Sequence, residues 1–366
     1  MNKVILITAN IAPYRLLWCE ELAKFFDVTI FYTKEKEKNY NDDFLKHSSN
    51  ICNIIRLSPN KKGDNPICFD VIKAIKDNKN SFIIFDGYGP LTNLLGLLYC
   101  KLINKKTYVN VDGYPTERKK NKIRELLRSI VIGRLCTNFF CSSQIVKEYL
   151  VRYGANPINI HIHNFSSITS KKIIKKPISK DEKIKLRKKY KLNIDGKLVL
   201  GVGRFVELKR FNDLINAVLT CNTKCDLLLL GGKPTKQYLD VVGNNKNIHF
   251  IDFVLPENVD DYYKMADLLV LPSETDVWGL VLNEAMAQGL PVISSDSVIG
   301  GKSMIDGNGM IFETYNVKQL GECIDLCLKT SNNSKMSKKS IEIIKNYTIE
   351  GMAKRQLPII NQYFKI

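Results

Sequence analysis

The sequence predicts an α/β protein with two doubly wound domains in series. The chain has 366 residues, more than one ordinary hydrophobic core holds, so two domains are expected. Each half alternates short apolar runs with helical patterns, which is typical of parallel sheets with crossover helices. A Lys- and Ser-rich segment, "SSITSKKIIKKPISKDEKIKLRKKY", lies between the halves. The predicted parts are an N-terminal domain at 1–165, a basic linker with a polar helix at 166–196, a C-terminal domain at 197–345 and a C-terminal segment at 346–366.

The first half contains four runs with the length and composition of buried strands. The largely apolar run that opens "MNKVILITANIAPYR" is only six residues long, which is too short for a signal peptide and indicates a first strand. No apolar stretch is long enough to cross a bilayer. The predicted strands are 3–9, 27–32, 80–87 and 106–113, and the predicted helices are 15–26, 92–103, 122–135 and 144–154.

The second half repeats this alternation. Its predicted strands are 197–203, 225–232, 247–254, 268–273, 290–296 and 309–313, and its predicted helices are 209–219, 259–266 and 279–289. Gly289 has the position of a glycine that ends a helix. Because open parallel sheets bind ligands at the carboxyl ends of their strands, the loops that follow these strands are the candidate sites.

The formal net charge of +18 belongs to the first half and the linker. Residues 1–166 hold 25 basic and 15 acidic residues, residues 167–197 hold 12 and 3, and the remainder holds 18 and 19. This excess favours a polyanionic partner, a membrane surface or a nucleic acid, unless it reflects only a lysine-rich proteome. The sequence has no recognised nucleic-acid module, and the charge avoids the half that carries the motifs. No nucleic-acid partner is therefore expected.

The sequence gives no indication of a metal site. Its ten cysteines are scattered and lack the companion ligands of a zinc site, so buried free thiols in a reducing cytoplasm are expected. There is no D-x-D pair for a divalent cation. His161 and His163 alternate along "NIHIHNF" and have no third ligand nearby in the sequence, which favours a structural role.

The first motif is "LGVGRFVELKRFNDLINA", which follows a strand and opens a helix. Gly201 and Gly203 permit a tight turn and a close approach of backbone. Arg204 and Lys209 add two cations at a strand-to-helix junction, where free backbone N–H groups also favour an anion such as a diphosphate. A plain turn with two solvated cations is the alternative.

The second motif is "LPSETDVWGLVLNEAMAQGLPVI", residues 271 to 293. Asp276 precedes a predicted helix and is either a helix cap or dipole-compensating acid, or a ligand contact. Glu284 lies inside that helix among apolar residues, where an ionised carboxylate is costly without a hydrogen-bond partner. A vicinal diol such as a ribose would be a suitable partner.

Taken together, these segments resemble the retaining GT-B glycosyltransferases, specifically the large family four of nucleotide-sugar-dependent enzymes, glycosyl transferases group 1. The specific segments are the two motifs above with "LLGG", "DFVLPENVDDYYKMADLLVLPSE" and "GNGMIF", in matching order and spacing. The resemblance implies the GT-B fold: two Rossmann-like domains face a cleft, and a C-terminal helix crosses back to the first domain.

The resemblance also implies roles for individual residues. Arg204 and Lys209 would grip the donor diphosphate, Glu284 would hold the ribose, and Asp276 would lie near the donor sugar. Further donor contacts are implied at the remaining matched positions: Gly203, Gly231, Phe253, Val254, Trp278, Gly279 and Leu280.

Three departures from the family pattern concern the site. Asp276 replaces the usual glutamate, and Glu274 is out of register as a substitute. The first loop reads "NIAPYR" in place of a glycine-rich one: Pro13 suits a first helical turn, and Arg15 either reaches a phosphate or acceptor or is a surface residue.

No active-site histidine is evident in the first domain. "NVDGYP" and "FDGYG" offer Asp112 and Asp86 instead. Asp112 would either contact a sugar or cap the following helix.

The implied activity is transfer of a sugar, with retention and without a metal cofactor, from a nucleotide sugar to a saccharide or lipid-linked acceptor in surface-glycan synthesis. The first domain would bind the acceptor and the second the donor. The expected location is the cytoplasm or the inner face of the membrane. The alternative is a nucleotide-sugar-binding GT-B protein that has another activity, such as epimerisation, or no catalysis.

One predicted helix bears on membrane contact. In "ERKKNKIRELLRSIVIGRLC" an apolar stripe is surrounded by basic residues. It would suit an anionic membrane surface, but packing of the stripe on the first domain's sheet is the favoured interpretation. The stripe consists of Ile123, Leu126, Leu127, Ile130 and Val131, and the basic residues are Lys119, Lys120, Lys122, Arg124 and Arg128.

Overall fold

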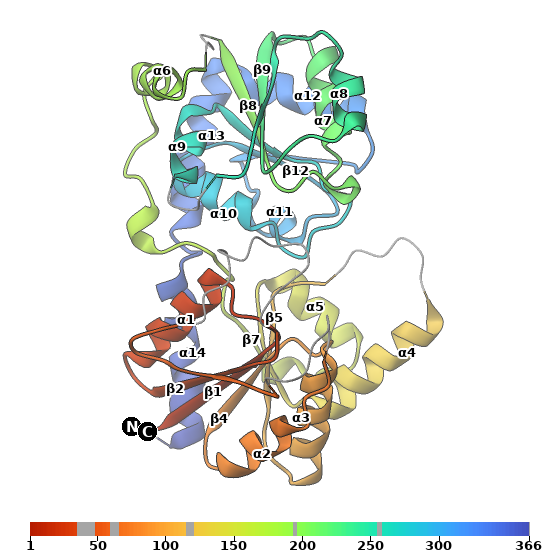
Figure 1. Cartoon of the computed structure of the whole chain (residues 1–366), viewed down its shortest axis with the longest axis vertical. Coiled ribbons are helices and arrows are strands. Elements are labelled where there is room, and N and C mark those ends of the chain that lie inside the picture. The colour runs from red at the N-terminus through yellow and green to blue at the C-terminus, as the bar shows by residue number, and fades with distance from the viewer. Residues whose placement is uncertain (35–47, 59–65, 115–120, 193–195, 255–257, 366) are drawn as a thin grey trace. The chain divides into compact units, whose positions relative to one another are not determined.

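The computed structural model divides the chain into two units, and it describes residues 1–34, 48–58, 66–114, 121–192, 196–254 and 258–365. The first unit comprises Met1–Ser167 with Thr348–Ile366, and the second comprises Ile168–Tyr347. Both are layers of helices on parallel sheets (Figure 1). Among the described residues, no helix combines the length and apolarity needed to cross a membrane.

The first unit contains a seven-stranded parallel sheet in the order β3-β2-β1-β4-β5-β6-β7. Strands β1, β2, β4 and β5 coincide with the four predicted runs, whereas β3, β6 and β7 are additional. The strands are β1 (Lys3–Thr8), β2 (Asp27–Tyr32), β3 (Asn53–Arg56), β4 (Phe82–Asp86), β5 (Tyr108–Val111), β6 (Asn138–Cys141) and β7 (Ile160–Ile162). The order reverses direction beside β1, which makes the carboxyl ends of β1 and β4 a switch point.

The helices of the first unit begin with α1, in which Pro13 takes the first position as predicted. A proline is favoured there because it needs no backbone hydrogen-bond acceptor. The predicted helix 122–135 is divided into an α-helix, α4, and a π-helical segment, η2. The elements are α1 (Pro13–Ala23), α2 (Asp70–Asp77), α3 (Leu91–Leu102), α4 (Lys122–Ile130), η2 (Val131–Leu135), α5 (Gln144–Arg152) and η3 (Pro157–Asn159).

The second unit contains a six-stranded parallel sheet in the order β10-β9-β8-β11-β12-β13. All six strands lie within predicted runs. The central strands β8, β9, β11 and β12 are almost entirely buried, as strands covered on both faces should be, whereas the edge strands β10 and β13 are partly exposed. They are β8 (Lys197–Val202), β9 (Cys225–Leu230), β10 (Ile248–Ile251), β11 (Leu268–Leu271), β12 (Val292–Ser295) and β13 (Gly309–Phe312).

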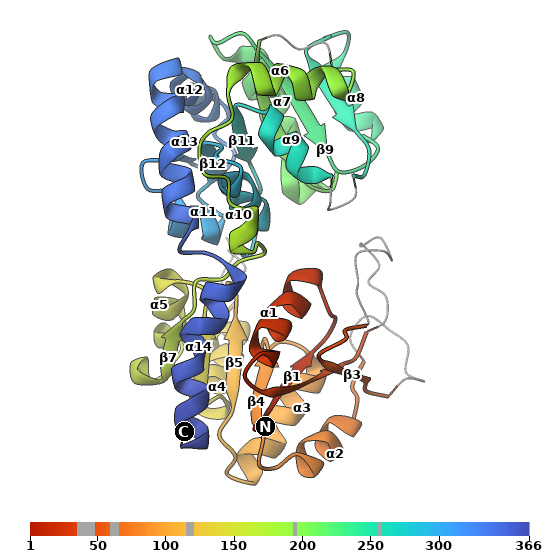
Figure 2. The ribbon, with the colours of Figure 1, turned by 90° about the vertical axis from the view of Figure 1, so that its left-hand side faces the viewer.

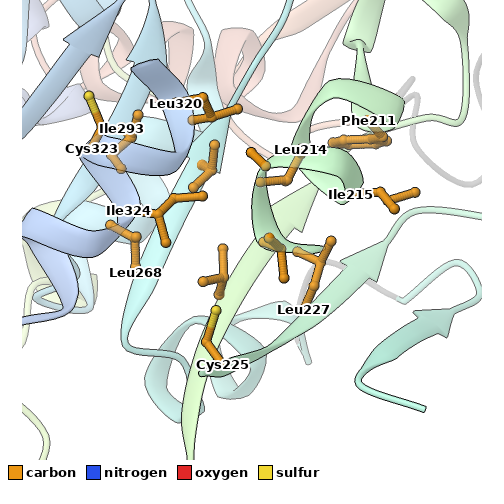
Figure 3. Close-up of a cluster of buried hydrophobic side chains, with 14 of the residues drawn as sticks. Phe211, Leu214, Ile215, Cys225, Leu227, Leu268, Ile293, Leu320, Cys323 and Ile324 are labelled. Carbon is orange, nitrogen blue, oxygen red and sulfur yellow. The ribbon is translucent and has the colours of Figure 1, made fainter. Parts of the chain in front are cut away.

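Helices on both faces bury this sheet. Figure 3 shows part of the core on one face, where Phe211 and Leu214 meet Leu227 and Ile324 between the strands and two helices, α7 and α12. The elements are η4 (Ser170–Lys172), α6 (Lys180–Lys189), η5 (Glu207–Lys209), α7 (Phe211–Thr220), α8 (Lys236–Val242), α9 (Val259–Met265), α10 (Leu280–Ala287), α11 (Ile299–Met304), α12 (Val317–Leu328) and α13 (Thr330–Ile344).

The polar helix expected in the basic segment is α6, and it is fastened to the second unit. Ser179 and Glu182 form a reciprocal capping box at its start. Its buried Arg187 donates to Asp267 at 3.0 Å, and Lys183 pairs with the same carboxylate at 2.7 Å. These charges are largely shielded from water, and each has a partner, as buried charges require.

The last helix, α14 (Ile349–Phe364), belongs to the first unit and packs beside α1 (Figure 2). Its buried Gln356 joins two elements: the Trp18 indole donates to Oε1 at 3.0 Å, and Nε2 lies 2.7 Å from His163 Nδ1. Burial, together with the positive charge of Arg15, lowers the pKa of His163 to about 3. His163 is therefore a neutral structural residue, as the sequence favours.

The sequence favoured packing of the apolar side of α4 on the sheet of the first unit, and this prediction is wrong. None of its residues is buried, so its apolar stripe does not pack on the sheet.

The ten cysteines are free, nine of them buried, as expected.

Candidate functional site

Two glycines bring the loops after β8 and β9 together in the second unit. Gly231 has a φ of +141°, and a Cβ atom there would lie 2.2 Å from the carbonyl oxygen of Gly203. The Gly203 N–H donates to Leu230 O at 2.9 Å. A side chain at Gly231 would therefore displace the backbone. The contact fixes the start of the loop that carries Arg204 and Lys209.

Lys209 and Asp276 form an ion pair between two loops at the carboxyl edge of this sheet. The Lys209 Nζ atom lies 2.7 Å from Asp276 Oδ2, and the two side chains are 20% and 19% exposed. The other carboxylate oxygen accepts weakly from the Trp278 N–H at 3.3 Å. The pair connects η5, after β8, with the turn after β11. The helix-cap alternative for Asp276 is wrong, because Gly279 is the N-cap of α10.

A sharp turn presents the amino end of α10. Gly279 has a φ of +85°, and a Cβ atom there would lie 2.8 Å from Leu271 Cδ2. The Trp278 ring is 2% exposed, and its indole donates to Asn283 Oδ1 at 2.8 Å. Its carbonyl accepts from the Gly300 N–H at 2.9 Å, so Trp278 holds the turn in place. The Leu280 and Val281 N–H groups at the start of α10 have no acceptor within the helix and favour an anion. The Leu282 N–H donates to Gly279 O at 2.9 Å.

Glu284 has a protein partner that the sequence did not reveal. The Tyr263 hydroxyl of α9 donates to Glu284 Oε2 at 2.6 Å. Burial raises the pKa of Glu284 from its ordinary value, although the bond from Tyr263 lowers it. Within the described part of the chain, no donor reaches Glu284 Oε1, which leaves that oxygen for a ligand. The sequence did not predict Tyr263 as a site residue, because a tyrosine in a helical apolar pattern is usually a core residue.

Arg204, Phe253 and Val254 lie in loops at the same edge of the sheet. Arg204 is exposed and follows β8 by two positions. Phe253 is 45% exposed and, with Val254, follows β10. Residues 255–257, which continue that loop, lie outside the described ranges.

The first unit collects three of the predicted residues into one charged cluster. The Arg15 Nη2 atom lies 2.7 Å from Asp86 Oδ1 and 2.6 Å from Asp112 Oδ2. Arg15 comes from the first turn of α1, Asp86 ends β4, and Asp112 follows β5. The cluster therefore marks the switch point of the sheet.

Two alternatives for these residues are wrong. Arg15 is not a surface residue, because its side chain is only 3% exposed. Asp112 does not cap the following helix: the side chain of Asn121 caps α4 by accepting from the N–H groups of Ile123 and Arg124.

The cluster has unused hydrogen-bonding capacity. One guanidinium faces two carboxylates, and the Thr8 hydroxyl also donates to Asp86, at 2.8 Å. Burial raises the pKa of Asp112 to about 6, although the Arg15 charge opposes the rise. Among the described residues, no partner reaches Asp112 Oδ1 or the Arg15 Nε and Nη1 atoms. Buried groups in this state are rare unless a ligand or water completes them.

The described ranges contain no group of three or more His, Cys, Asp or Glu side chains placed to hold a metal ion.

Comparison with known proteins identifies the second unit. Residues 182–346 match the family model of glycosyl transferases group 1. The match covers most of the second unit and less than half of the whole chain. The predicted α/β GT-B architecture is confirmed, because solved glycosyltransferases share the fold over nearly the whole chain. The predicted family is supported over the residues that the family model matches.

Relatives of this chain differ in how much of it they match. N-acetyl-alpha-D-glucosaminyl L-malate synthase of Bacillus anthracis is 34% identical over 122 residues, which is 32% of each protein. The chain thus aligns with about a third of that relative. The O-antigen biosynthesis glycosyltransferase WclY of Escherichia coli is 23% identical over 94% of this chain and 93% of its own.

Two solved structures share the fold over nearly the whole chain. A glycosyltransferase from Rickettsia africae has a TM-score of 0.74 at 16% identity and covers 100% of this chain and 99% of its own. Anabaena Alr3699/HepE, solved in complex with UDP, has a TM-score of 0.77 at 14% identity and covers 99% and 100%.

Proposed function

We propose that this protein is a retaining glycosyltransferase that moves a sugar from a nucleotide-sugar donor to a saccharide or lipid-linked acceptor in surface-glycan assembly. The observation that carries the proposal is the edge of the second sheet, where a basic loop, a helix amino end and the Glu284 carboxylate lie within one glycosyl transferases group 1 unit. Its relatives include an O-antigen glycosyltransferase, and a similar structure holds UDP.

The donor would use three features of the second unit. Arg204, Lys209 and the amino end of α10 would take the diphosphate, since all three favour negative charge. Glu284 would accept from a ribose hydroxyl through Oε1, while Tyr263 holds Oε2. The backbone at Gly203, Gly231, Trp278 and Gly279 would allow close approach, with Phe253 and Val254 beside the base.

In the transfer step, the acceptor hydroxyl oxygen forms a bond to the anomeric carbon as the bond from that carbon to the diphosphate oxygen breaks. The electron pair stays on the diphosphate, and the acceptor proton leaves to a diphosphate oxygen. Attack on the face of the leaving group retains the donor configuration. Arg204 and Lys209 would stabilise the growing charge without a metal ion.

The acceptor would bind to the first unit. Asp112 Oδ1 and the unpaired N–H groups of Arg15 can accept from and donate to sugar hydroxyls, which carry both functions. Asp86 would keep Arg15 in place, and Pro13 would fix the turn that delivers it.

The proposal is tested by incubating the full chain with UDP-, GDP- and ADP-sugars and following donor hydrolysis and melting temperature. A glycosyltransferase is expected to release nucleoside diphosphate from at least one donor and to melt at a higher temperature with it. A thermal shift without turnover would indicate a binding protein, and no response to any donor would refute both.

Two substitutions at Asp276 are expected to differ. Asp276→Glu keeps a negative charge beside Lys209 and should retain transfer activity. Asp276→Asn keeps an acceptor for the Trp278 N–H but removes that charge, and it should lower transfer about tenfold or more. Steady-state rates with the preferred donor measure both, and full activity in both variants would show that Asp276 only shapes the loop.

A further inference from the structure

The helix α4 turns its apolar side to solvent. Ile123, Leu126, Leu127 and Ile130 are 70%, 62%, 55% and 43% exposed. Their spacing of i, i+3, i+4 and i+7 places them on one face, here called the α4 stripe. An exposed apolar stripe of this length marks an interaction site more often than an ordinary surface.

The orientation of α4 is fixed by its polar side. Glu125 lies two positions after Ile123 and therefore on the opposite side of the helix. Its carboxylate accepts from the Tyr153 hydroxyl at 3.5 Å and lies 4.0 Å from Arg152 Nη2 at the end of α5. The charged residue thus faces the body of the first unit while the leucines face outward, the reverse of a helix that covers a core.

Both ends of α4 are structured although the helix buries nothing. Asn121 caps its first turn. After its last turn, Ile132 of η2 is fully buried, and Gly133 packs so closely on α5 that a Cβ atom would lie 3.0 Å from Tyr153 O. Figure 1 shows α4 running outward from the first unit. The chain therefore maintains a capped and anchored helix whose apolar face has no partner among the described residues.

The charge around the stripe identifies the kind of partner. Residues 117–134 contain seven basic and two acidic residues. Lys122, Arg124 and Arg134 are exposed on α4 and η2. Basic residues beside an apolar face favour an interface with anionic lipids, in which the apolar side chains enter the headgroup boundary and the cations meet phosphates. Pairing with a second copy would bring these like charges together.

We propose that α4 is a membrane-docking helix that binds an anionic lipid surface through the α4 stripe and the cations beside it. This inference goes beyond the proposed transferase activity and does not depend on it. It makes a lipid-linked acceptor the natural one for the first unit.

The test is co-sedimentation of the full chain with vesicles of phosphatidylcholine mixed with phosphatidylglycerol, and with vesicles of phosphatidylcholine alone. The wild-type protein should bind the anionic vesicles and release with salt. Leu126→Asp combined with Leu127→Asp should weaken binding by about tenfold or more, because two leucines that would enter the lipid headgroup boundary are replaced by anions. Leu219→Asp, at a 40% exposed position on α7 of the second unit, is the matched control and should bind like wild type.

The double variant should fold normally, because no residue of α4 is buried. Its melting temperature should therefore equal that of the wild type. Lys122→Gln combined with Arg124→Gln should reduce binding and its salt dependence together. Three results would overturn the proposal: no wild-type binding to anionic vesicles, wild-type-like binding by the double variant, or a wild-type dimer that the double variant dissociates while vesicles are not bound.

Discussion

Replacing Lys209 with methionine is expected to lower kcat for sugar transfer by about a hundredfold or more, the range seen when one donor to a developing charge is removed. The Lys209 ammonium has three donors, and Asp276 takes one of them at 2.7 Å. Two donors remain for the diphosphate that leaves. Because this charge grows along the reaction, the loss should fall mainly on kcat and less on KM.

Two controls separate this effect from a loss of folding. Both partners of the ion pair are partly exposed, so breaking it should change the free energy of unfolding by only about 1 kcal/mol. Lys224→Met, at an exposed position in the turn before β9, should leave kcat unchanged. Wild-type turnover by Lys209→Met would remove Lys209 from the catalytic machinery.

Replacing Arg15 with methionine is expected to destabilise the first unit by about 3–5 kcal/mol, the usual result of removing one partner of a buried ion pair. The substitution leaves Asp86 and Asp112 facing each other without the cation that lies 2.6–2.7 Å from both. Chemical denaturation followed by circular dichroism measures the loss. Adding Asp86→Asn and Asp112→Asn should recover part of it, because no buried charge then remains.

The loss of folding stability in Arg15→Met should be larger at high pH than at low pH. Burial raises the pKa of Asp112 to about 6 even with Arg15 present, and removal of Arg15 should raise it further. The pKa of an aspartate in an unfolded chain is about 3.9. Between that pH and the raised pKa, the folded variant therefore binds a proton that the unfolded chain has released. The stability of Arg15→Met should therefore fall as pH rises from 4 through the raised pKa. An equal loss at pH 5 and pH 8 would contradict this assignment.

The sequence predicted the second unit better than the first, for a physical reason. Its central strands are buried on both faces and give largely apolar runs, such as "LVLGV" in β8. In the first unit, β3 is an edge strand with alternating exposure, and β6 and β7 are only four and three residues long. The partly exposed β3 and the three-residue β7 therefore carry little apolar pattern.

At the site, the sequence predicted residue types but not their partners. The motifs led to Lys209, Asp276 and Glu284, yet the Lys209–Asp276 pair and the Tyr263 hydroxyl bond depend on which loops the sheet order brings together. The sequence likewise did not reveal the partners of Arg15, because Asp86 and Asp112 are brought together from the ends of separate strands. The error at α4 shows the limit of periodicity: an apolar stripe reveals a face, but not what the face meets.

The central claim is that the second unit binds the ribose and diphosphate of a nucleotide sugar, with Glu284 on the ribose. Calorimetric titration of the wild type and Glu284→Gln with UDP, GDP and ADP and their 2′,3′-dideoxy forms tests it directly. Glutamine retains an oxygen for the Tyr263 hydroxyl but removes the charge offered to the diol. We predict that at least one diphosphate binds the wild type about tenfold or more tightly than its dideoxy form, and that Glu284→Gln binds both forms alike. Absence of binding by all three diphosphates, or undiminished discrimination in Glu284→Gln, would contradict the claim.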